Sequence, residues 1–238
     1  MTITATPKPL WRQPDLAVPS RRGTPGFWPA MALLMVVWAL RASIGFNIDL
    51  ALDPAYRPIY SNLVKFALWV VPAAAFVTWV RRDSLIRALR LGLPSARALP
   101  LSAALIAAYL AGVALDTARK HGATLAELGT ALSERGLANF AGALPSAFSE
   151  EVLFRGLVLT ELSERWGFWP ANAASGVLFV SMHWPHRIWR NGLGVGVVAD
   201  APALFAIALA LGFVTWRTRS IWPAVIFHAA NNTVTGIL

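Results

Sequence analysis

The chain alternates between long apolar blocks and short charged segments. Crossing about 30 Å of hydrocarbon as a helix takes roughly 20 mainly apolar residues. Seven blocks approach or exceed that length: Phe27–Phe46, Phe66–Val80, Ala98–Leu115, Leu137–Leu162, Phe168–Trp184, Ala203–Trp216 and Ile221–Leu238. Because backbone polar groups in lipid must be paired within their own segment, such runs predict helices. The pattern predicts an all-α, polytopic helix bundle with seven transmembrane helices, or eight if residues 125–137 or 192–198 also enter the membrane.

Composition supports a membrane protein and excludes several other classes. Apolar residues make up 56% of the 238 positions and charged residues only 14%, whereas a soluble domain carries about 25% charged residues. This is too little charge to cover a water-facing surface, which excludes a disordered chain and argues against an ordinary soluble enzyme. The sequence contains no cysteine, so disulfides, thiolate zinc sites and a cysteine nucleophile are all impossible.

The net charge of +9 is better explained by membrane topology than by nucleic-acid binding, because the basic residues gather in particular loops. Lysine and arginine are enriched in cytoplasmic loops, so these clusters predict a cytoplasmic N-terminus in a bacterial inner or plasma membrane. Residues 1–26 are predicted to be a disordered basic arm, 27–136 the N-terminal transmembrane helices and 137–238 a catalytic core. The clusters comprise Lys8, Arg12, Arg21 and Arg22 in the leader, Arg81, Arg82, Arg87, Arg90 and Arg97 after the second block, and Arg217 and Arg219 before the last.

The fourth block contains ionisable residues that a lipid-facing helix would not carry. Each costs at least about 2.5–3.5 kcal/mol at the centre of a membrane helix, so such residues are functional candidates. Glu151 and Arg155 are four residues apart on one helix face, where an ion pair would offset much of the cost of burial. Glu150 is turned about 100° from Glu151. We therefore expect Glu150 to be the carboxylate that is left free to act.

Two later blocks also carry polar side chains at helical spacing. Phe179 and His183 share a face in the fifth block, as do His228 and Asn232 in the last. Three helices that each project polar groups away from lipid should converge inside the bundle. A carboxylate and an imidazole can together hold a water and take its proton, and a histidine and an amide can donate to a developing oxyanion. Since the chain has no GxSxG or HExxH motif, hydrolysis by activated water is favoured over an acyl-enzyme.

These residues resemble the three motifs of the CAAX-protease and bacteriocin-processing (CPBP, or Abi) family of intramembrane endopeptidases, which includes the Ras-converting CAAX endopeptidase. The motifs occur in order as Glu150-Glu151-x-x-x-Arg155, Phe179-x-x-x-His183 and His228-x-x-x-Asn232, and the likeness extends from about residue 145 to the C-terminus. The resemblance implies a glutamate-type protease without a cofactor. Glu150 and His183 would activate the water, His228 and Asn232 would form the oxyanion hole, and Glu151 and Arg155 would organise the site.

The implied substrate is a membrane-anchored protein, a prenylated tail or a leader peptide, with membrane lipid as the surroundings and no nucleic acid as a partner. Two other functions remain open. A zinc metalloprotease could use Glu150, His183 and His228 as ligands with a water, and a bacteriocin-immunity protein would need no hydrolysis. Several other polar residues are expected to have no functional role. His186, in a loop beside Arg187, is expected to be a satisfied core histidine, His121 a surface residue, and Glu161 and Glu164, near Arg165, part of a solvated helix end.

Overall fold

The computed structural model describes residues 23–237, and every regular element in this range is helical. The predicted disordered arm therefore lies mostly outside the described residues. The elements are α1 (Phe27–Ala42), α2 (Phe46–Ala51), α3 (Arg57–Lys65), η1 (Phe66–Val70), α4 (Val71–Ala75), η2 (Phe76–Arg81), α5 (Leu85–Ala88), η3 (Ala96–Ala98), α6 (Leu99–His121), α7 (Leu125–Glu151), η4 (Val152–Val158), α8 (Leu159–Trp166), α9 (Phe168–Ser181), α10 (Trp184–Asn191), α11 (Val195–Val198), α12 (Ala201–Thr218) and α13 (Trp222–Thr235).

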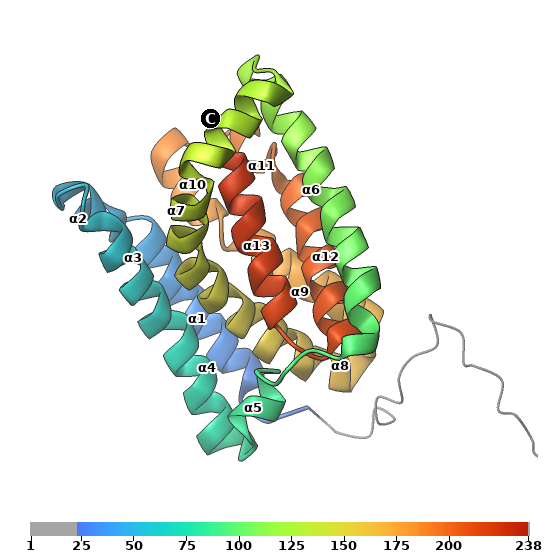
Figure 1. Cartoon of the computed structure of the whole chain (residues 1–238). Coiled ribbons are helices and arrows are strands. Elements are labelled where there is room, and N and C mark those ends of the chain that lie inside the picture. Colours follow the sequence, from blue (N-terminus) through green and yellow to red (C-terminus); the bar gives the residue numbers. More distant parts are fainter. Residues whose placement is uncertain (1–22, 238) are drawn as a thin grey trace, which may run out of the picture.

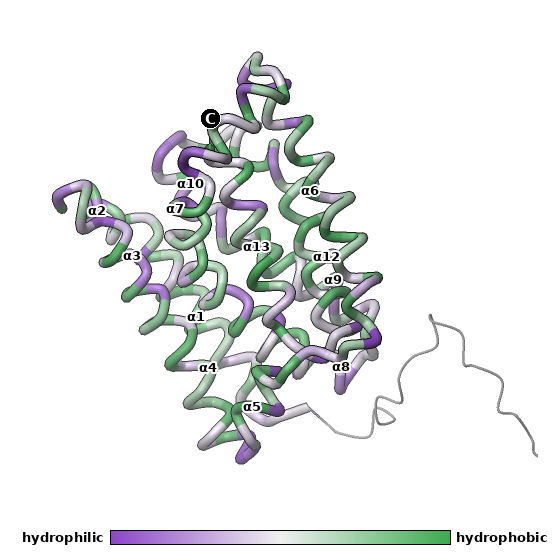
Figure 2. Tube along the Cα trace, viewed as in Figure 1, coloured by the Kyte–Doolittle hydropathy of each residue, from purple (hydrophilic) through white to green (hydrophobic). Residues whose placement is uncertain are grey.

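Long helices run back and forth between two ends of the molecule (Figure 1). We call the end that carries α5, α8 and the α12–α13 turn the arginine-rich end, and the end that carries α2, α10 and the α6–α7 turn the opposite end. Hydropathy varies along the length of the bundle: apolar positions dominate the middle of the outer helices, and hydrophilic positions gather towards both ends (Figure 2). This is the distribution expected of helices that cross a membrane.

Four helical stretches are long and apolar enough to span a membrane: Phe27–Ala51, Arg57–Arg81, Ala96–His121 and Val195–Thr218. They correspond to the first, second, third and sixth predicted blocks. The all-helical membrane fold is thus confirmed, whereas seven or eight spans are not. The other three blocks are the ones that carry the polar motifs, and α9 and α13 have only 14 residues each. Helices buried among neighbours need neither the length nor the uniform apolarity that lipid contact demands.

The motif-bearing helices lie at the centre of the packing. Helix α13 packs against α7, α6 and α12, while α9 packs against α12 and α8. Between α7 and α8 the chain continues through η4, one π-helical stretch of seven residues that are all buried. In η4, Gly156 faces the carbonyl of Leu89, which a Cβ would approach at 3.1 Å, so the glycine allows a close approach of η4 to the loop after α5.

Polar contacts stabilise helix ends at both ends of the bundle. At the opposite end, Thr124 and Glu127 form a reciprocal capping box that starts α7, satisfying backbone donors that a helix start leaves unpaired. At the arginine-rich end, Glu161 has no exposed surface and accepts hydrogen bonds from Arg81 Nη1 at 2.5 Å and Thr24 Oγ1 at 2.9 Å. The expectation of a solvated terminus is therefore wrong for Glu161, because Arg81 folds back from another helix to neutralise it.

Candidate active site

Glu150 lies on the last turn of α7, where the helix meets the interior of the bundle. Only 4% of its surface is exposed. Lys65 Nζ donates to Glu150 Oε1 at 2.6 Å and to Ser146 Oγ at 2.6 Å, and Ser146 Oγ lies 3.2 Å from Glu150 Oε1. The second oxygen, Glu150 Oε2, is buried and has no hydrogen-bond partner among the described residues. The expectation that Glu150 is a free carboxylate is therefore corrected, since one oxygen is held by a lysine and the other is open.

Lys65 is the site residue that the sequence reasoning missed. It ends α3 at the start of the second apolar stretch, and its ammonium lies 5.4 Å from the ring centre of Trp69 and 6.0 Å from that of Trp38. The available signal was its position inside Arg57–Arg81, a candidate membrane span, because an ionisable residue there is itself a functional candidate. That rule singled out the fourth, fifth and last blocks but applies equally to the second.

Glu151 organises a second, fully buried network. Arg155 Nη1 donates to Glu151 Oε1 at 3.2 Å, and Arg155 Nη2 donates to the Ala208 carbonyl at 3.1 Å. The side chains of Glu151 and Arg155 are 0% and 1% exposed, respectively. The Arg155 guanidinium lies 4.5 Å from the ring centre of Phe179. The i,i+4 ion pair expected from the sequence is present, so these two buried charges neutralise each other within one helical stretch.

His228 connects the two glutamates. Its Nδ1 lies 2.8 Å from Glu151 Oε1, and its Nε2 lies 3.7 Å from Glu150 Oε2. Because an ionised carboxylate can only accept, the bond to Glu151 places a proton on Nδ1. The Nε2 atom is then directed towards the open oxygen of Glu150. A role in the oxyanion hole alone would not require His228 Nε2 to lie within 3.7 Å of Glu150 Oε2.

His183 falls inside the fifth predicted block but lies in the turn between α9 and α10, just beyond the end of α9, with its Nδ1 2.9 Å from the carbonyl of Phe179. Since a carbonyl only accepts, this bond also fixes a proton on Nδ1 and leaves Nε2 of the neutral ring as an acceptor. The ring centre is 5.1 Å from that of Phe179, which is 5.8 Å from His228. Phe179 therefore packs against both histidines and explains the spacing of the second motif.

Asn232 lies one turn beyond His228 on α13 and is partly buried. Its Oδ1 accepts from Asn231 Nδ2 at 3.4 Å, and it makes no hydrogen bond to the glutamates. The structure thus brings Glu150, Glu151, Arg155 and His228 into contact, while Asn232 stands apart from this network. A role in the oxyanion hole stays a prediction.

A cavity of about 380 Å³ joins Glu150, His183 and Lys65. Its wall towards the opposite end is formed by α1, α2 and α10, and includes the Arg41–Asp49 ion pair, whose atoms are 2.8 Å apart. His186 also lines it, from α10, and contacts Phe46 edge-on. The expectation that His186 is a loop residue is therefore wrong. The complete lining is Trp38, Arg41, Ala42, Phe46, Asp49, Ser61, Val64, Lys65, Glu150, Met182, His183, His186 and Arg187.

A metal site would require several ligands to converge on one point. Among residues 23–237, no group of three or more His, Cys, Asp or Glu side chains is arranged so that it could hold a metal ion. In particular, one oxygen of Glu150 is taken by Lys65, and the position next to a lysine ammonium is unfavourable for a cation. The residues present therefore do not fit the three-ligand zinc site.

The site is thus a buried cluster of carboxylates and histidines that lies beside a cavity, inside an apolar helix bundle. Residues 136–234 match the family model described as type II CAAX prenyl endopeptidase Rce1-like. This range includes all three motifs, so the family resemblance predicted from them is confirmed over this part of the chain. No curated protein and no solved structure matches the chain.

Proposed function

We propose that the protein is an intramembrane endopeptidase that hydrolyses a peptide bond with a water activated by Glu150 and histidine. The observation that carries the proposal is the asymmetry of the Glu150 carboxylate. One oxygen is held by Lys65 at 2.6 Å, and the other is a buried acceptor without a hydrogen-bond partner among the described residues. Buried acceptors are almost always paired. An open one next to a cavity and two imidazoles is suited to binding water.

Lys65 supplies the condition that a general base in this place needs. A buried carboxylate without a partner would take up a proton rather than bear its charge. The ammonium beside Oε1 keeps Glu150 ionised, so Oε2 can accept a proton from the attacking water. That proton can pass to the leaving nitrogen when the C–N bond breaks, which returns Glu150 to its starting state.

The histidines have complementary roles in this proposal. His183 Nε2 is an acceptor that can orient the water from the cavity side. His228 Nε2 can donate to the oxyanion when the ring is protonated, and Glu151, at 2.8 Å from Nδ1, stabilises that positive charge. Asn232 is the second oxyanion donor if the substrate reaches one turn further along α13. Glu151 and Arg155 then act through His228 and not on the substrate.

The test is cleavage of a library of membrane-anchored peptides by the purified protein in liposomes, read out by mass spectrometry. Glu150→Gln should abolish cleavage, whereas Glu134→Gln, an exposed position on the same helix, should not change it. Cleavage should continue with a chelator present. Chelator-sensitive cleavage would indicate the zinc mechanism, and cleavage by Glu150→Gln at the normal rate would refute the role of Glu150. No cleavage by any form of the protein would favour an immunity function.

A further inference from the structure

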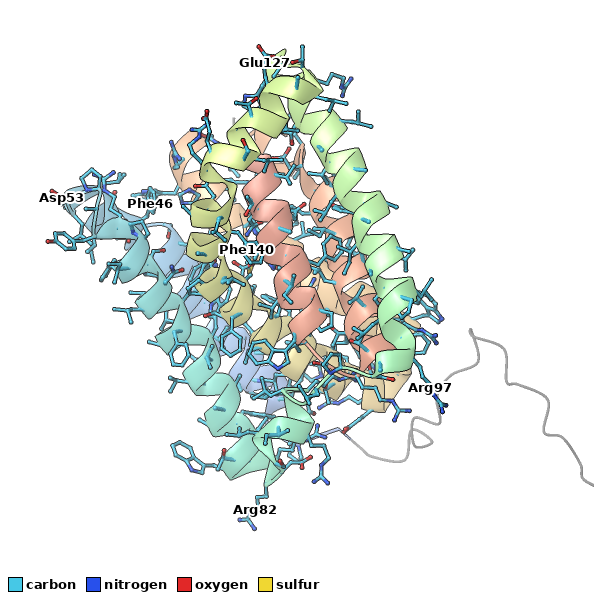
Figure 3. All side chains as sticks on the ribbon, in the orientation of Figure 1. Phe46, Asp53, Arg82, Arg97, Glu127 and Phe140 are labelled. Carbon is cyan, nitrogen blue, oxygen red and sulfur yellow. The ribbon has the colours of Figure 1, made fainter. Side chains whose placement is uncertain are left out.

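Arg90 is a half-buried arginine in the turn after α5, at the arginine-rich end of the bundle. Its backbone is left-handed, with a φ of 53°, and its carbonyl accepts a hydrogen bond from the Ile221 N–H at 3.0 Å. The side chain reaches α8, where Arg90 Nε donates to Thr160 Oγ1 at 3.1 Å. Arg82 and Arg97, by contrast, are exposed and extend away from the bundle at the same end (Figure 3). Arg90 thus differs from these neighbours in carrying its charge inward.

No described carboxylate neutralises the Arg90 guanidinium. Within residues 23–237 it forms no ion pair, and its two Nη atoms make no hydrogen bond. The three carboxylates that the structure describes at this end are held by Arg81 instead, whose guanidinium contacts Asp83 at 3.2 Å, Glu161 at 2.5 Å and Glu164 at 2.6 Å. Charges that are taken out of water are normally paired in folded proteins. The surroundings of Arg90 therefore lack one negative charge.

A second arginine adds to this excess of positive charge. Arg219 is exposed in the turn between α12 and α13, and this turn is bonded to the segment that follows Arg90, since Ser220 Oγ donates to the Gly92 carbonyl at 2.7 Å. Burial lowers the pKa of Arg90 to about 10; the charge of Glu164 opposes this shift and that of Arg219 adds to it. Two arginines thus lie near each other where the described carboxylates are already paired.

The segment that carries Arg90 has the features of a membrane–water boundary. Leu93 is 92% exposed, and an apolar side chain is more stable in lipid than in water. Trp222 is 38% exposed and donates from Nε1 to the Leu91 carbonyl at 2.9 Å, and tryptophan is enriched at membrane interfaces. The candidate membrane span Ala96–His121 begins shortly after this segment. The phosphates of phospholipids lie at this level, just outside the hydrocarbon.

We infer that Arg90 and Arg219 bind the phosphate of an anionic phospholipid. A guanidinium presents parallel N–H donors that match phosphate oxygens, and such charge-assisted bonds are strong. Because Nε of Arg90 is held by Thr160, its Nη1 and Nη2 atoms are the donors left for the headgroup, and neither is fully enclosed by the protein. Basic pockets between membrane helices bind lipid headgroups in this way. None of these residues lines the cavity beside Glu150, so the inference does not rest on the protease function.

The test is lipid binding by the full-length protein, purified in a neutral detergent and stripped of lipid. Phosphatidylglycerol, phosphatidylcholine and inorganic phosphate are titrated separately, and binding is measured from the rise in Tm and from bound lipid in native mass spectra. The variant is Arg90→Gln. Its control is Arg82→Gln, the same substitution at the same end and in the same left-handed backbone conformation, with a φ of 54°, but at an exposed position.

We expect phosphatidylglycerol to raise the Tm of the wild type and of Arg82→Gln, and to bind Arg90→Gln about 10- to 100-fold more weakly, which is the effect of losing a charge-assisted contact. Without lipid, Arg90→Gln should be at least as stable as the wild type, because it removes a charge that has no counter-ion. Arg90→Lys keeps the charge but not the planar group, so its affinity should lie between the two. This variant provides the comparison if Arg90→Gln does not fold.

Equal affinities of the wild type, Arg90→Lys and Arg90→Gln for phosphatidylglycerol would overturn the inference, as would a loss of the same size in Arg82→Gln. Equal stabilisation by phosphatidylcholine would remove the preference for an anionic lipid. Equal stabilisation by inorganic phosphate would make the ligand a free phosphate, and either result would overturn the assignment to an anionic phospholipid. The measurement does not involve cleavage, so a Glu150→Gln background should give the same result.

Discussion

Replacing Arg155 by methionine should be among the most damaging single changes to stability. The substitution leaves Glu151, which has no exposed surface, without its guanidinium, and it removes the donor to the Ala208 carbonyl. Breaking one partner of a buried ion pair costs about 3–5 kcal/mol. His228 Nδ1 still contacts Glu151 at 2.8 Å, which compensates in part. We therefore expect a loss near the lower figure, about 3 kcal/mol.

The measurement is thermal unfolding of the purified protein in detergent. For a chain of this length, 1 kcal/mol corresponds to roughly 2–4 °C in Tm, so Arg155→Met should lower Tm by about 6–12 °C. The control is Arg119→Met, which removes an ion pair with Asp116 whose side chains are 82% and 45% exposed; such pairs contribute little. Equal Tm values for the two variants would refute the claim that the Glu151–Arg155 pair is a necessary part of the core.

Three further predictions follow from the contacts at the site and at the arginine-rich end. Lys65→Met should lower kcat about 100-fold or more, because Glu150 becomes protonated and loses its function as a base. Lys65→Arg should retain more activity, and the control Ser61→Ala should resemble the wild type. A wild-type kcat in Lys65→Met would contradict this prediction. Glu161→Gln should destabilise the protein by about 1–3 kcal/mol, because it removes the fully buried carboxylate that lies 2.5 Å from Arg81 Nη1, while Glu164 at 2.6 Å and Asp83 at 3.2 Å keep part of the guanidinium charge paired. An unchanged denaturation midpoint would speak against this. Burial raises the pKa of Asp83, but hydrogen bonds from Arg87, the Ser84 N–H and Arg81 outweigh this effect and hold the pKa below its usual value. The ionised Asp83 therefore stabilises the fold above about pH 3.9, and this stabilisation is lost as the pH falls through the lowered pKa. On acidification the Tm of the wild type should thus fall more steeply than that of Asp83→Asn, and parallel curves for the two proteins would exclude the effect.

Hydropathy predicted the class of fold because a membrane imposes one strong rule, that backbone groups must be paired inside each helix. The first, second, third and sixth blocks satisfy the length and composition of spans in the structure. The blocks that carry the motifs were less predictable as spans. Their helices are surrounded by protein, so length and apolarity no longer constrain them, and α9 ends before His183 instead of including it.

Within the site, local spacing predicted what lies on a single helix. The Glu151–Arg155 pair follows from the i,i+4 geometry, and the contact of His183 with the Phe179 carbonyl follows from the same spacing. Contacts between distant segments could not be derived in this way. Lys65 and Glu150 are 85 residues apart, and only the packing of α3 against α7 brings them together. Similarly, the sequence around Glu161 is typical of a solvated helix end, and only the packing of η2 brings Arg81 beside it.

The central claim is that Glu150 activates the water that cleaves the substrate, and the most direct measurement is the single-turnover cleavage rate of one identified peptide. The rate for Glu150→Gln, which keeps the shape of the side chain but not its basicity, is compared with the rates for the wild type and for Glu134→Gln. The account predicts a loss of about 100-fold to 10,000-fold for Glu150→Gln and no change for Glu134→Gln, with both variants folded at the same Tm as the wild type within a few degrees. A rate for Glu150→Gln within about threefold of the wild-type rate would contradict it.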